Sequence, residues 1–417
     1  MHAVGAYGES LDPWLVAVPS ALLILDDSGS EVSDPFEGET MKVIIAPDSF
    51  KECLSAKEVA NVIAEGIMAE IPDAECVCVP VADGGEGTME ALVDATHGRV
   101  IPVTVTGPLG EQVNAQFGLL GDQQTAVVEM ASASGIELVS PQERDPLKAT
   151  SYGTGELIKR ALEENISKII VAIGGSATND GGAGMLQALG VRFTREDGSE
   201  IGFGGGELGD IARIDISNLD PRLQHVEVLT ACDVDNPLTG ERGASVVFGP
   251  QKGATPEMVK RLDANLRHYA NCVKAATDCD IEFEKGAGAA GGMGAALLAF
   301  LDATLMPGID IVLNTVEFEK TLVGADLVIT GEGRIDSQTI HGKTPVGVSR
   351  VAQKHDIKTI ALAGSVGDGV EVLKSAGIIA CFSVVSSPCE LKDAIAQGRE
   401  NLLKTAKQLA SVIAHFN

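Results

Sequence analysis

The hydrophobic positions of the chain follow a strand, loop and helix order from residue 41 onward. Residues 42–47 (KVIIAP) form a continuous apolar run, which is typical of a strand buried on both faces. After a polar loop, Ser55 and Glu58 have the spacing of a helix capping box, and the following apolar residues fall on one helical face. A second apolar run at 76–82 predicts the next strand. This order predicts a right-handed βαβ unit at the start of an α/β fold.

The middle of the chain has a different pattern. Short alternating segments at 104–110, 113–120 and 125–131 predict the strands of a mixed sheet. The apolar runs at 168–175 and 226–233 then return to the pattern of buried strands. Thr255, Pro256 and Glu257 have the order of a helix start, with a cap, a proline at the first helical position and an acidic first turn. The middle is therefore expected to form a sheet of its own.

A chain of 417 residues is longer than a single hydrophobic core usually supports, so more than one domain is expected. The alternation of strands and helices resumes after Gly286. We therefore predict a Rossmann-like domain with a doubly wound parallel sheet, built from residues 41–95 and 290–417. A second, mixed α/β domain of residues 96–289 is predicted to be inserted in it.

Residues 1–40 differ in composition from the rest of the chain. They contain eight acidic residues, no Lys or Arg, and the only Trp of the sequence, Trp14. Their apolar run at 15–25 is shorter than the ~20 residues that span a bilayer, and no basic signal-peptide segment precedes it. We interpret residues 1–40 as a mostly disordered extension, for which a misassigned start codon is one explanation. An ordered segment that packs through Trp14 is the alternative.

Composition and charge narrow the classes of function. A hydrophobic content of 45% and a charged content of 22% are those of a soluble globular protein. The net charge of −28 argues against non-specific nucleic-acid binding, which needs basic patches, but is compatible with a small anionic substrate. The eight cysteines include no CxxC pair, as expected of reduced thiols in a cytoplasmic protein. We expect no nucleic-acid or membrane partner, and either a monomer or a homodimer.

Five polar loops follow predicted strands, which is where open α/β sheets bind ligands. Each loop contains Asp, Glu, Asn or Lys, and the loops 82–88, 174–184 and 330–344 combine these residues with glycines. The loops span residues 47–51, 82–88, 174–184, 231–237 and 330–344. Turn chemistry alone accounts for a single loop of this kind. Their recurrence after several strands predicts an active site assembled from both domains.

Two glycine-rich motifs bear on the choice of cofactor. Residues 286–291 match the GxGxxG fingerprint of dinucleotide binding, but the preceding segment is short and charged, unlike a Rossmann strand. The same loop suits a phosphate, because small residues expose N–H groups at a helix N-terminus. Residues 342–344 (GKT) resemble the end of a Walker motif, yet Ser337 stands where its first glycine belongs. The sequence therefore has no P-loop, and an NAD-dependent dehydrogenase remains an alternative.

The polar loops also supply the groups that phosphoryl transfer uses, namely cations, carboxylates for Mg²⁺, backbone N–H groups and a site for the acceptor hydroxyl. The candidate cations are Lys51, Lys252, Arg334 and Lys343. The candidate carboxylates are Asp48, Asp83, Glu86, Asp180, Asp233, Glu332 and Asp336. The sequence contains no serine-hydrolase elbow, HExxH motif or protein-kinase signature.

Six strings in and around these loops are long enough to compare with known families. They are MKVIIAPDSFKECLSA, VPVADGGEGTMEAL, GGSATNDGGAGMLQALG, FGPQKGA, GAGAAGGMGAAL and ITGEGRIDSQTIHGKTPVGV. In content and order they closely resemble the bacterial glycerate kinase type-1 family, from Met41 almost to the C-terminus. The resemblance implies ATP-dependent phosphorylation of D-glycerate, usually at the 2-hydroxyl to give 2-phosphoglycerate, by a two-domain α/β fold with one domain inserted in the other. Phosphorylation of the 3-hydroxyl remains open.

The chemistry of the candidate residues and their predicted positions guide the assignment of roles. MgATP is expected in the cleft between the domains, with its phosphates near the glycine loop 286–294. Arg334 or Lys51 is expected to bind the carboxylate of glycerate, and Asp180 or Asp233 to orient the acceptor hydroxyl, take its proton or bind Mg²⁺. The expected nucleotide-binding residues are Gly286, Gly288, Gly291, Gly292 and Lys343. The further substrate-binding candidates are Asp48, Ser49, Asp83, Glu86, Asn179, Asp336 and His341. A non-catalytic regulator that binds a sugar acid is the remaining alternative.

Overall fold

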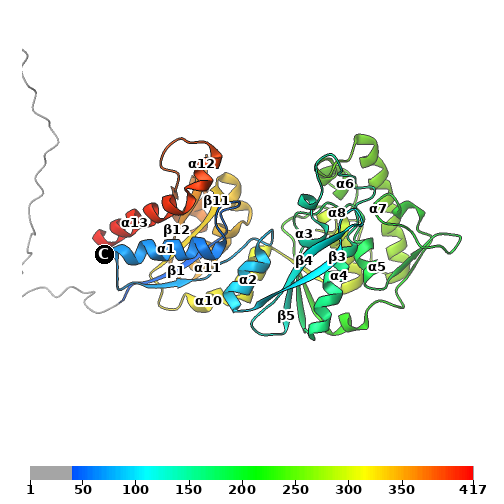
Figure 1. The fold of residues 1–417 in the computed structure, drawn as a ribbon, viewed down its shortest axis with the longest axis horizontal. Coiled ribbons are helices and arrows are strands. Elements are labelled where there is room, and N and C mark those ends of the chain that lie inside the picture. The colour runs from blue at the N-terminus through cyan, green and yellow to red at the C-terminus, as the bar shows by residue number, and fades with distance from the viewer. Residues whose placement is uncertain (1–39, 417) are drawn as a thin grey trace, which may run out of the picture. The chain divides into compact units, whose positions relative to one another are not determined.

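The computed structural model describes residues 40–416, apart from the side chains of His341 and Phe416. From Met41 onward the described chain forms one compact unit with two main sheets (Figure 1). The predictions made for residues 1–39, including the role of Trp14, lie outside the described residues.

The first sheet has five parallel strands in the order β13-β12-β11-β1-β2. Strands from both ends of the compact unit meet in its middle, where Val43 pairs in register with Leu327. The strands are β1 (Lys42–Pro47), β2 (Glu75–Cys78), β11 (Leu327–Ile335), β12 (Lys358–Val366) and β13 (Ile378–Ser383). The predicted parallel sheet is thus confirmed.

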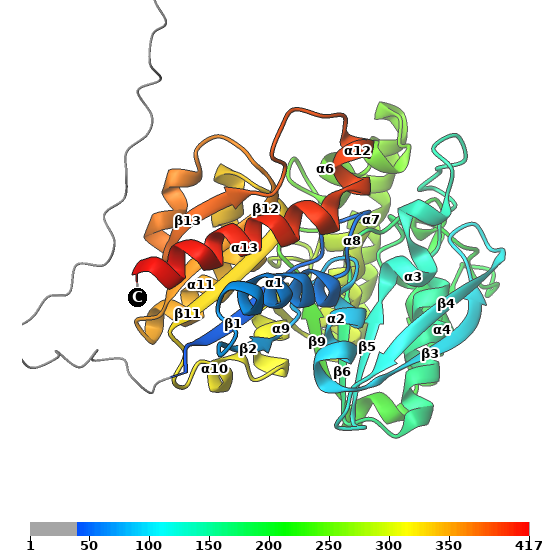
Figure 2. The ribbon, with the colours of Figure 1, turned by 60° about the vertical axis from the view of Figure 1, so that its left-hand side comes forward.

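Helices cover both faces of the five-stranded sheet, as a doubly wound fold requires. α1 (Ala56–Glu70) and α13 (Gly398–Phe416) lie side by side on one face (Figure 2). α9 (Gly308–Thr315) and α11 (Thr344–Lys354) pack on the other face. The predicted fold class, a doubly wound α/β sheet with a second mixed α/β region, is confirmed.

The second sheet has six strands in the order β10-β9-β6-β5-β4-β3. β3, β4 and β5 are antiparallel neighbours, whereas β5, β6, β9 and β10 run parallel, so the sheet is mixed as predicted. Its strands are β3 (Arg99–Thr106), β4 (Gln112–Leu119), β5 (Thr125–Glu129), β6 (Lys168–Ala172), β9 (Glu227–Ala231) and β10 (Thr304–Met306). A small separate hairpin pairs β7 (Arg192–Thr194) with β8 (Arg213–Asp215).

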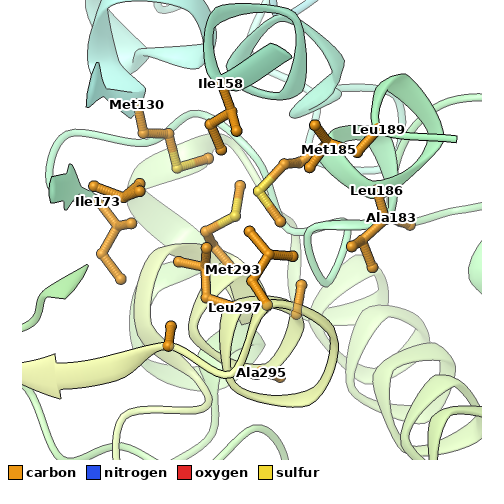
Figure 3. Close-up of a cluster of buried hydrophobic side chains, with 14 of the residues drawn as sticks. Met130, Ile158, Ile173, Ala183, Met185, Leu186, Leu189, Met293, Ala295 and Leu297 are labelled. Carbon is orange, nitrogen blue, oxygen red and sulfur yellow. The ribbon is translucent and has the colours of Figure 1, made fainter. Parts of the chain in front are cut away.

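The core of the six-stranded sheet lies against helices α4 (Tyr152–Ala161), α5 (Ala183–Ala188), α7 (Pro256–Thr277) and α8 (Ala289–Leu301). Figure 3 shows Met185 and Met293 pointing toward each other within this cluster. The remaining α-helices of the described chain are α2 (Thr88–Thr96), α3 (Met130–Ser134), α6 (Ala244–Phe248), α10 (Phe318–Thr321) and α12 (Leu391–Ala396). Within residues 40–416, none of the helices combines the length and the apolar character needed to cross a membrane.

Two helix starts have the side-chain caps that the sequence predicts. Ser55 Oγ accepts from the N–H of Glu58 at 3.3 Å, and the Ser55 N–H donates to Glu58 Oε2 at 2.9 Å. Thr255 Oγ1 accepts from the N–H of Met258 at 3.3 Å at the start of α7. Each cap satisfies an N–H group that the first helical turn leaves without an internal partner.

The two sheets share part of their core. Met89 of α2 and Ile309 of α9 belong to a buried cluster that also contains Ile44 of β1 and Ile170 of β6. This shared cluster explains why the chain from Met41 onward forms one compact unit. Its division into two domains stays a prediction.

The segment 290–306 lies in a different place from the one predicted. The sequence assigned it to the parallel sheet, but α8 packs in the core of the six-stranded sheet and β10 pairs with β9. α8 is apolar on nearly every side, so its hydrophobic pattern has no face that indicates which sheet it covers. The chain returns to the five-stranded sheet only at β11.

Candidate active site

A cavity of about 480 Å³ lies where loops from both sheets converge. The loops that follow β1, β6 and β9, and the loop 82–88 after β2, all contribute to its wall. Its polar side chains are Lys51, Asp83, Ser176, Asp233, Gln251 and Lys252. Four of the five predicted polar loops therefore meet at one cavity, which we call the central cavity.

Lys252 is the most buried cation of the central cavity, with 2% of its surface exposed. Its Nζ donates to Ser176 Oγ and to the carbonyl oxygen of Thr178, both at 2.7 Å. Burial lowers the pKa of the Lys252 ammonium to about 7, although the nearby Asp180 carboxylate acts in the opposite direction. The sequence marked Lys252 as a candidate cation without giving it a role. Its place in the glycine-flanked string FGPQKGA was the available signal.

Asp233 contributes a carboxylate to the same cavity. Its Oδ1 accepts from the N–H of Gly308 at 3.0 Å. Burial raises the pKa of Asp233 to about 6, and the charges of Asp83 and Asp310 act in the same direction. A carboxylate with this pKa is ionised at neutral pH and is more basic than an ordinary aspartate.

A second group of acidic residues adjoins the central cavity. Thr344 Oγ1 donates to Asp48 Oδ2 at 2.6 Å, and the N–H of Ser49 donates to Asp48 Oδ1 at 2.6 Å. Burial and the neighbouring Asp83 carboxylate raise the pKa of Asp48 to about 7. Burial also raises the pKa of Glu332, which accepts from Thr339 Oγ1 at 3.0 Å. The fifth polar loop, 330–344, thus packs against the loop after β1.

Lys343 and Arg334 form ion pairs with neighbouring acids rather than lining the central cavity. Lys343 Nζ lies 3.5 Å from Glu332 Oε2. The exposed Arg334 pairs through Nε with Asp336 Oδ2 at 3.2 Å. Asp336 in turn caps the following helical turn by accepting from the N–H of Gln338 at 2.9 Å. These contacts give Arg334 and Asp336 a local structural role.

Asp180, which the sequence made a candidate for the acceptor hydroxyl and for Mg²⁺, does not line the central cavity. Its side chain is 1% exposed, and Oδ2 accepts from both the N–H and the Oγ of Ser151 at 2.8 Å. It also accepts from the N–H groups of Gly182 and Gly184 at 3.2 and 3.3 Å. The carboxylate therefore holds the turn that leads into α5, because short polar side chains in glycine-rich loops readily bond nearby N–H groups.

The other candidate residues of the polar loops differ from one another in burial. Asn179 is fully buried, and its Nδ2 donates to Ser245 Oγ at 2.9 Å. Glu86 is exposed, and Lys51 is exposed at the wall of the central cavity. The side chain of His341 lies outside the described part of the structure.

The glycine loop 286–294 packs closely against neighbouring backbone. A Cβ at Gly288 would clash with the carbonyl oxygen of Pro237, and one at Gly291 with that of Thr178. A Cβ at Gly286 would meet the side chain of Leu305, and one at Gly292 the backbone of Gly181. Ala289 and Ala290 line the central cavity at the start of α8. Close packing thus accounts for these glycines by itself, and their role in nucleotide binding stays a prediction.

A parallel sheet whose carboxyl-end loops bring lysines and carboxylates into one cavity is the arrangement of an α/β enzyme that acts on small anionic substrates. The chain matches the sequence model described as the glycerate kinase family over residues 43–414. It therefore belongs to the glycerate kinase family and is a kinase.

Individual relatives are similar over nearly their whole length. The chain is 54% identical over 374 residues to glycerate 2-kinase of Escherichia coli strain K12, covering 90% of this chain and 98% of the relative. It is 54% identical to glycerate kinase of Bacillus subtilis strain 168, covering 89% and 98%. A crystal structure from Salmonella typhimurium LT2, of a protein described as glycerate kinase 2, is 53% identical. It superposes with a TM-score of 0.84 and covers 90% of this chain and 99% of that one.

Proposed function

We propose that this protein transfers the γ-phosphoryl group of ATP to the 2-hydroxyl of D-glycerate, giving 2-phosphoglycerate and ADP. The observation that carries the proposal is the convergence of Lys51, Lys252 and Asp233 on the central cavity. The relative from E. coli, which is named glycerate 2-kinase, supports the 2-hydroxyl over the 3-hydroxyl.

Lys252 is the residue that we assign to the carboxylate of glycerate. Its ammonium is buried, so little water screens its attraction for an anion. Binding of a carboxylate would also raise its lowered pKa and keep the lysine charged at neutral pH. This assignment replaces Arg334, whose guanidinium pairs with Asp336 at the surface.

Asp233 is the residue that we assign to the acceptor hydroxyl. Its raised pKa makes it a better proton acceptor than an ordinary aspartate while leaving it ionised at neutral pH. In the reaction, the 2-hydroxyl oxygen forms a bond to the γ-phosphorus and the bond to the β-phosphate oxygen breaks. The hydroxyl proton passes to Asp233. Lys51 offsets the charge on the moving phosphoryl group.

The oxygen donors beside the cavity fit a magnesium ion that arrives with ATP. Within residues 40–416, no three His, Cys, Asp or Glu side chains come together as a preformed metal site. Mg²⁺ in nucleotide sites is typically held by about one or two carboxylates together with the phosphates. Asp83 would serve as such a carboxylate, since Asp233 is assigned to the hydroxyl proton, and the ion would neutralise phosphate charge.

The test is D-glycerate-dependent release of ADP by the purified full chain. We expect ADP release from MgATP to rise strongly when D-glycerate is added, and the Lys252→Met variant to lose most of this increase. An unchanged rate of ADP release with and without D-glycerate would overturn the proposal. NADH formation from glycerate and NAD would instead revive the dehydrogenase alternative.

A further inference from the structure

A second cavity, of about 700 Å³, lies at the carboxyl ends of β1, β11, β12 and β13. Its wall is formed by residues 50–53, 364–366 and 383–389, together with α12. Lys51 lines both this cavity and the central cavity. We call it the sheet-edge cavity. The roles assigned above leave it without a ligand.

We propose that the sheet-edge cavity binds the nucleoside of the nucleotide substrate, so that the phosphates extend past Lys51 into the central cavity. This inference rests on the proposed phosphoryl transfer. In this arrangement glycerate binds in the central cavity and the nucleoside in the sheet-edge cavity, with Lys51 between the two cavities.

The position of the cavity in the sheet supports a nucleoside. From β1 the chain continues to β2 on one side, whereas β11, β12 and β13 extend on the other side. The strand order therefore reverses between β1 and β11. Open α/β sheets bind ligands in the crevice at the carboxyl ends of the strands beside such a reversal. Phe50 and Lys51 follow β1, and Gly333 lies near the end of β11, so both sides of the reversal contribute to the wall.

The chemistry of the wall suits a flat, largely apolar base with polar edges. Phe50, Val384, Val385, Leu391 and Ile395 supply apolar surface. Leu391 is 75% exposed, and α12 has no buried residue, so this apolar surface is open to a ligand. Pockets for small molecules are mostly apolar with a few polar groups, in volumes of about 300–1,000 Å³.

Polar groups and backbone complete the site. The hydroxyls of Ser365, Ser386 and Ser387 lie in the wall, where they can donate to a base or ribose. β11 and β12 contribute Gly333 and Gly364 to the wall, and a Cβ at Gly364 would clash with the carbonyl oxygen of Gly333. Gly364 is therefore required by the close approach of the two strands, and this part of the wall is backbone.

Two cysteines in the wall allow a direct test that does not depend on catalysis. Cys389 is exposed, whereas Cys53 is less accessible and its Sγ donates to the carbonyl oxygen of Ile395 at 3.3 Å. Cys78 is also exposed, but it lies on β2 and outside the cavity wall. Cys389 therefore serves as the probe and Cys78 as the internal reference in the same chain.

The experiment measures the rate of iodoacetamide modification at each cysteine of the full chain by peptide mass spectrometry. A nucleotide at about ten times its Kd should slow modification of Cys389 about tenfold, since only the unliganded fraction reacts. Adenosine at a saturating concentration should also protect, whereas tripolyphosphate and D-glycerate should not. Modification of Cys78 should be unaffected. An unprotected Cys389 at a nucleotide concentration that saturates binding would overturn the inference.

A pair of variants tests whether protection comes from direct contact. Leu391→Asp places a charge in the apolar wall, whereas Val323→Asp changes a residue of equal 75% exposure that precedes the amino end of β11. We expect Leu391→Asp to weaken ATP binding about tenfold or more with the KM for D-glycerate nearly unchanged, because only interactions with the nucleotide are lost. We expect Val323→Asp to change neither. A Leu391→Asp variant that binds ATP normally would contradict the inference.

The same data separate this inference from the proposed function. Nucleotide protection of Cys389 without any phosphorylation of glycerate would support the nucleoside site and remove the proposed reaction. Phosphorylation of glycerate without protection of Cys389 would leave the reaction standing and overturn the nucleoside site.

Discussion

Lys252 and Ser176 meet in the wall of the central cavity, where Nζ donates to Oγ at 2.7 Å across 76 positions of sequence. The contact joins the loop after β6 to residues 248–254 (FGPQKGA) and holds the long side chain of Lys252 in one position. Both hydrogen-bond partners of the buried Lys252 ammonium are neutral oxygens, so the carboxylate of a bound substrate would supply a directly paired counter-charge.

The first prediction concerns the charge of Lys252. Lys252→Met keeps most of the side-chain volume and removes the ammonium. We expect kcat/KM for D-glycerate to fall at least about thirtyfold, because loss of one partner of a buried charged pair costs about 2 kcal/mol or more. Steady-state kinetics measure the effect. Lys274→Met is the matched control, since that lysine is 55% exposed and pairs with Asp280. Equal kinetics for the two variants would exclude the assigned role.

The second prediction is a pH profile with two limbs. Asp233 must be ionised to accept the hydroxyl proton, so kcat/KM should rise as pH increases through about 6. Lys252 must be charged to bind the carboxylate, so kcat/KM should fall as pH increases through about 7. The residual activity of Asp233→Asn should no longer rise through about pH 6, whereas its fall through about pH 7 should remain. A profile that is flat across these values would contradict both assignments.

The third prediction treats Asp180 as a structural residue. Asparagine cannot replace all the hydrogen bonds that the carboxylate accepts from Ser151, Gly182 and Gly184. We expect Asp180→Asn to lower the free energy of unfolding by about 2 kcal/mol, because a buried N–H left unsatisfied costs about 1–3 kcal/mol. Thermal or denaturant unfolding measures this loss. At a permissive temperature and a slightly acidic pH, where Lys252 stays charged without the help of the Asp180 carboxylate, the kinetics should stay close to those of the parent. A normal melting temperature with greatly reduced turnover would return Asp180 to the catalytic group.

The fourth prediction separates packing from backbone conformation in the glycine loop. Gly291 has a φ of +71° and faces the carbonyl oxygen of Thr178, whereas Gly324 has a φ of +72° with open space around it. Gly324→Ala should show only the cost of the left-handed conformation, roughly 1–2 kcal/mol. Gly291→Ala should cost a further 1–3 kcal/mol or so from overpacking. Denaturant unfolding of both variants gives the difference, and equal losses would show that the loop can relax.

The sequence predicts those features of the fold that depend on local patterns. The apolar run of β1, the capping box of Ser55 and Glu58, and the cap at Thr255 are confirmed, because each is set by neighbouring residues. The convergence of the polar loops follows from their position at the carboxyl ends of strands. The place of α8 could not be predicted, because an all-round apolar helix fits either sheet.

The orientation of individual loop side chains could not be predicted from the sequence. Asp180 and Asp233 both lie in loops that follow buried strands, yet one bonds N–H groups of its own loop and the other lines the cavity. Residue type is the same in the two cases, and the difference lies in which N–H groups the tertiary structure brings near. Lys252 could not be recognised as buried for a similar reason, since its partners Ser176 and Thr178 are distant in sequence.

The central claim is the phosphorylation of D-glycerate at its 2-hydroxyl, and proton-coupled phosphorus NMR of the reaction product tests it most directly. In 2-phosphoglycerate the phosphorus couples to the single methine proton, so the account predicts a doublet that appears as ATP is consumed. In 3-phosphoglycerate the phosphorus couples to two methylene protons. A triplet in place of the doublet would contradict the choice of hydroxyl, and inorganic phosphate as the sole new signal would contradict glycerate as the acceptor.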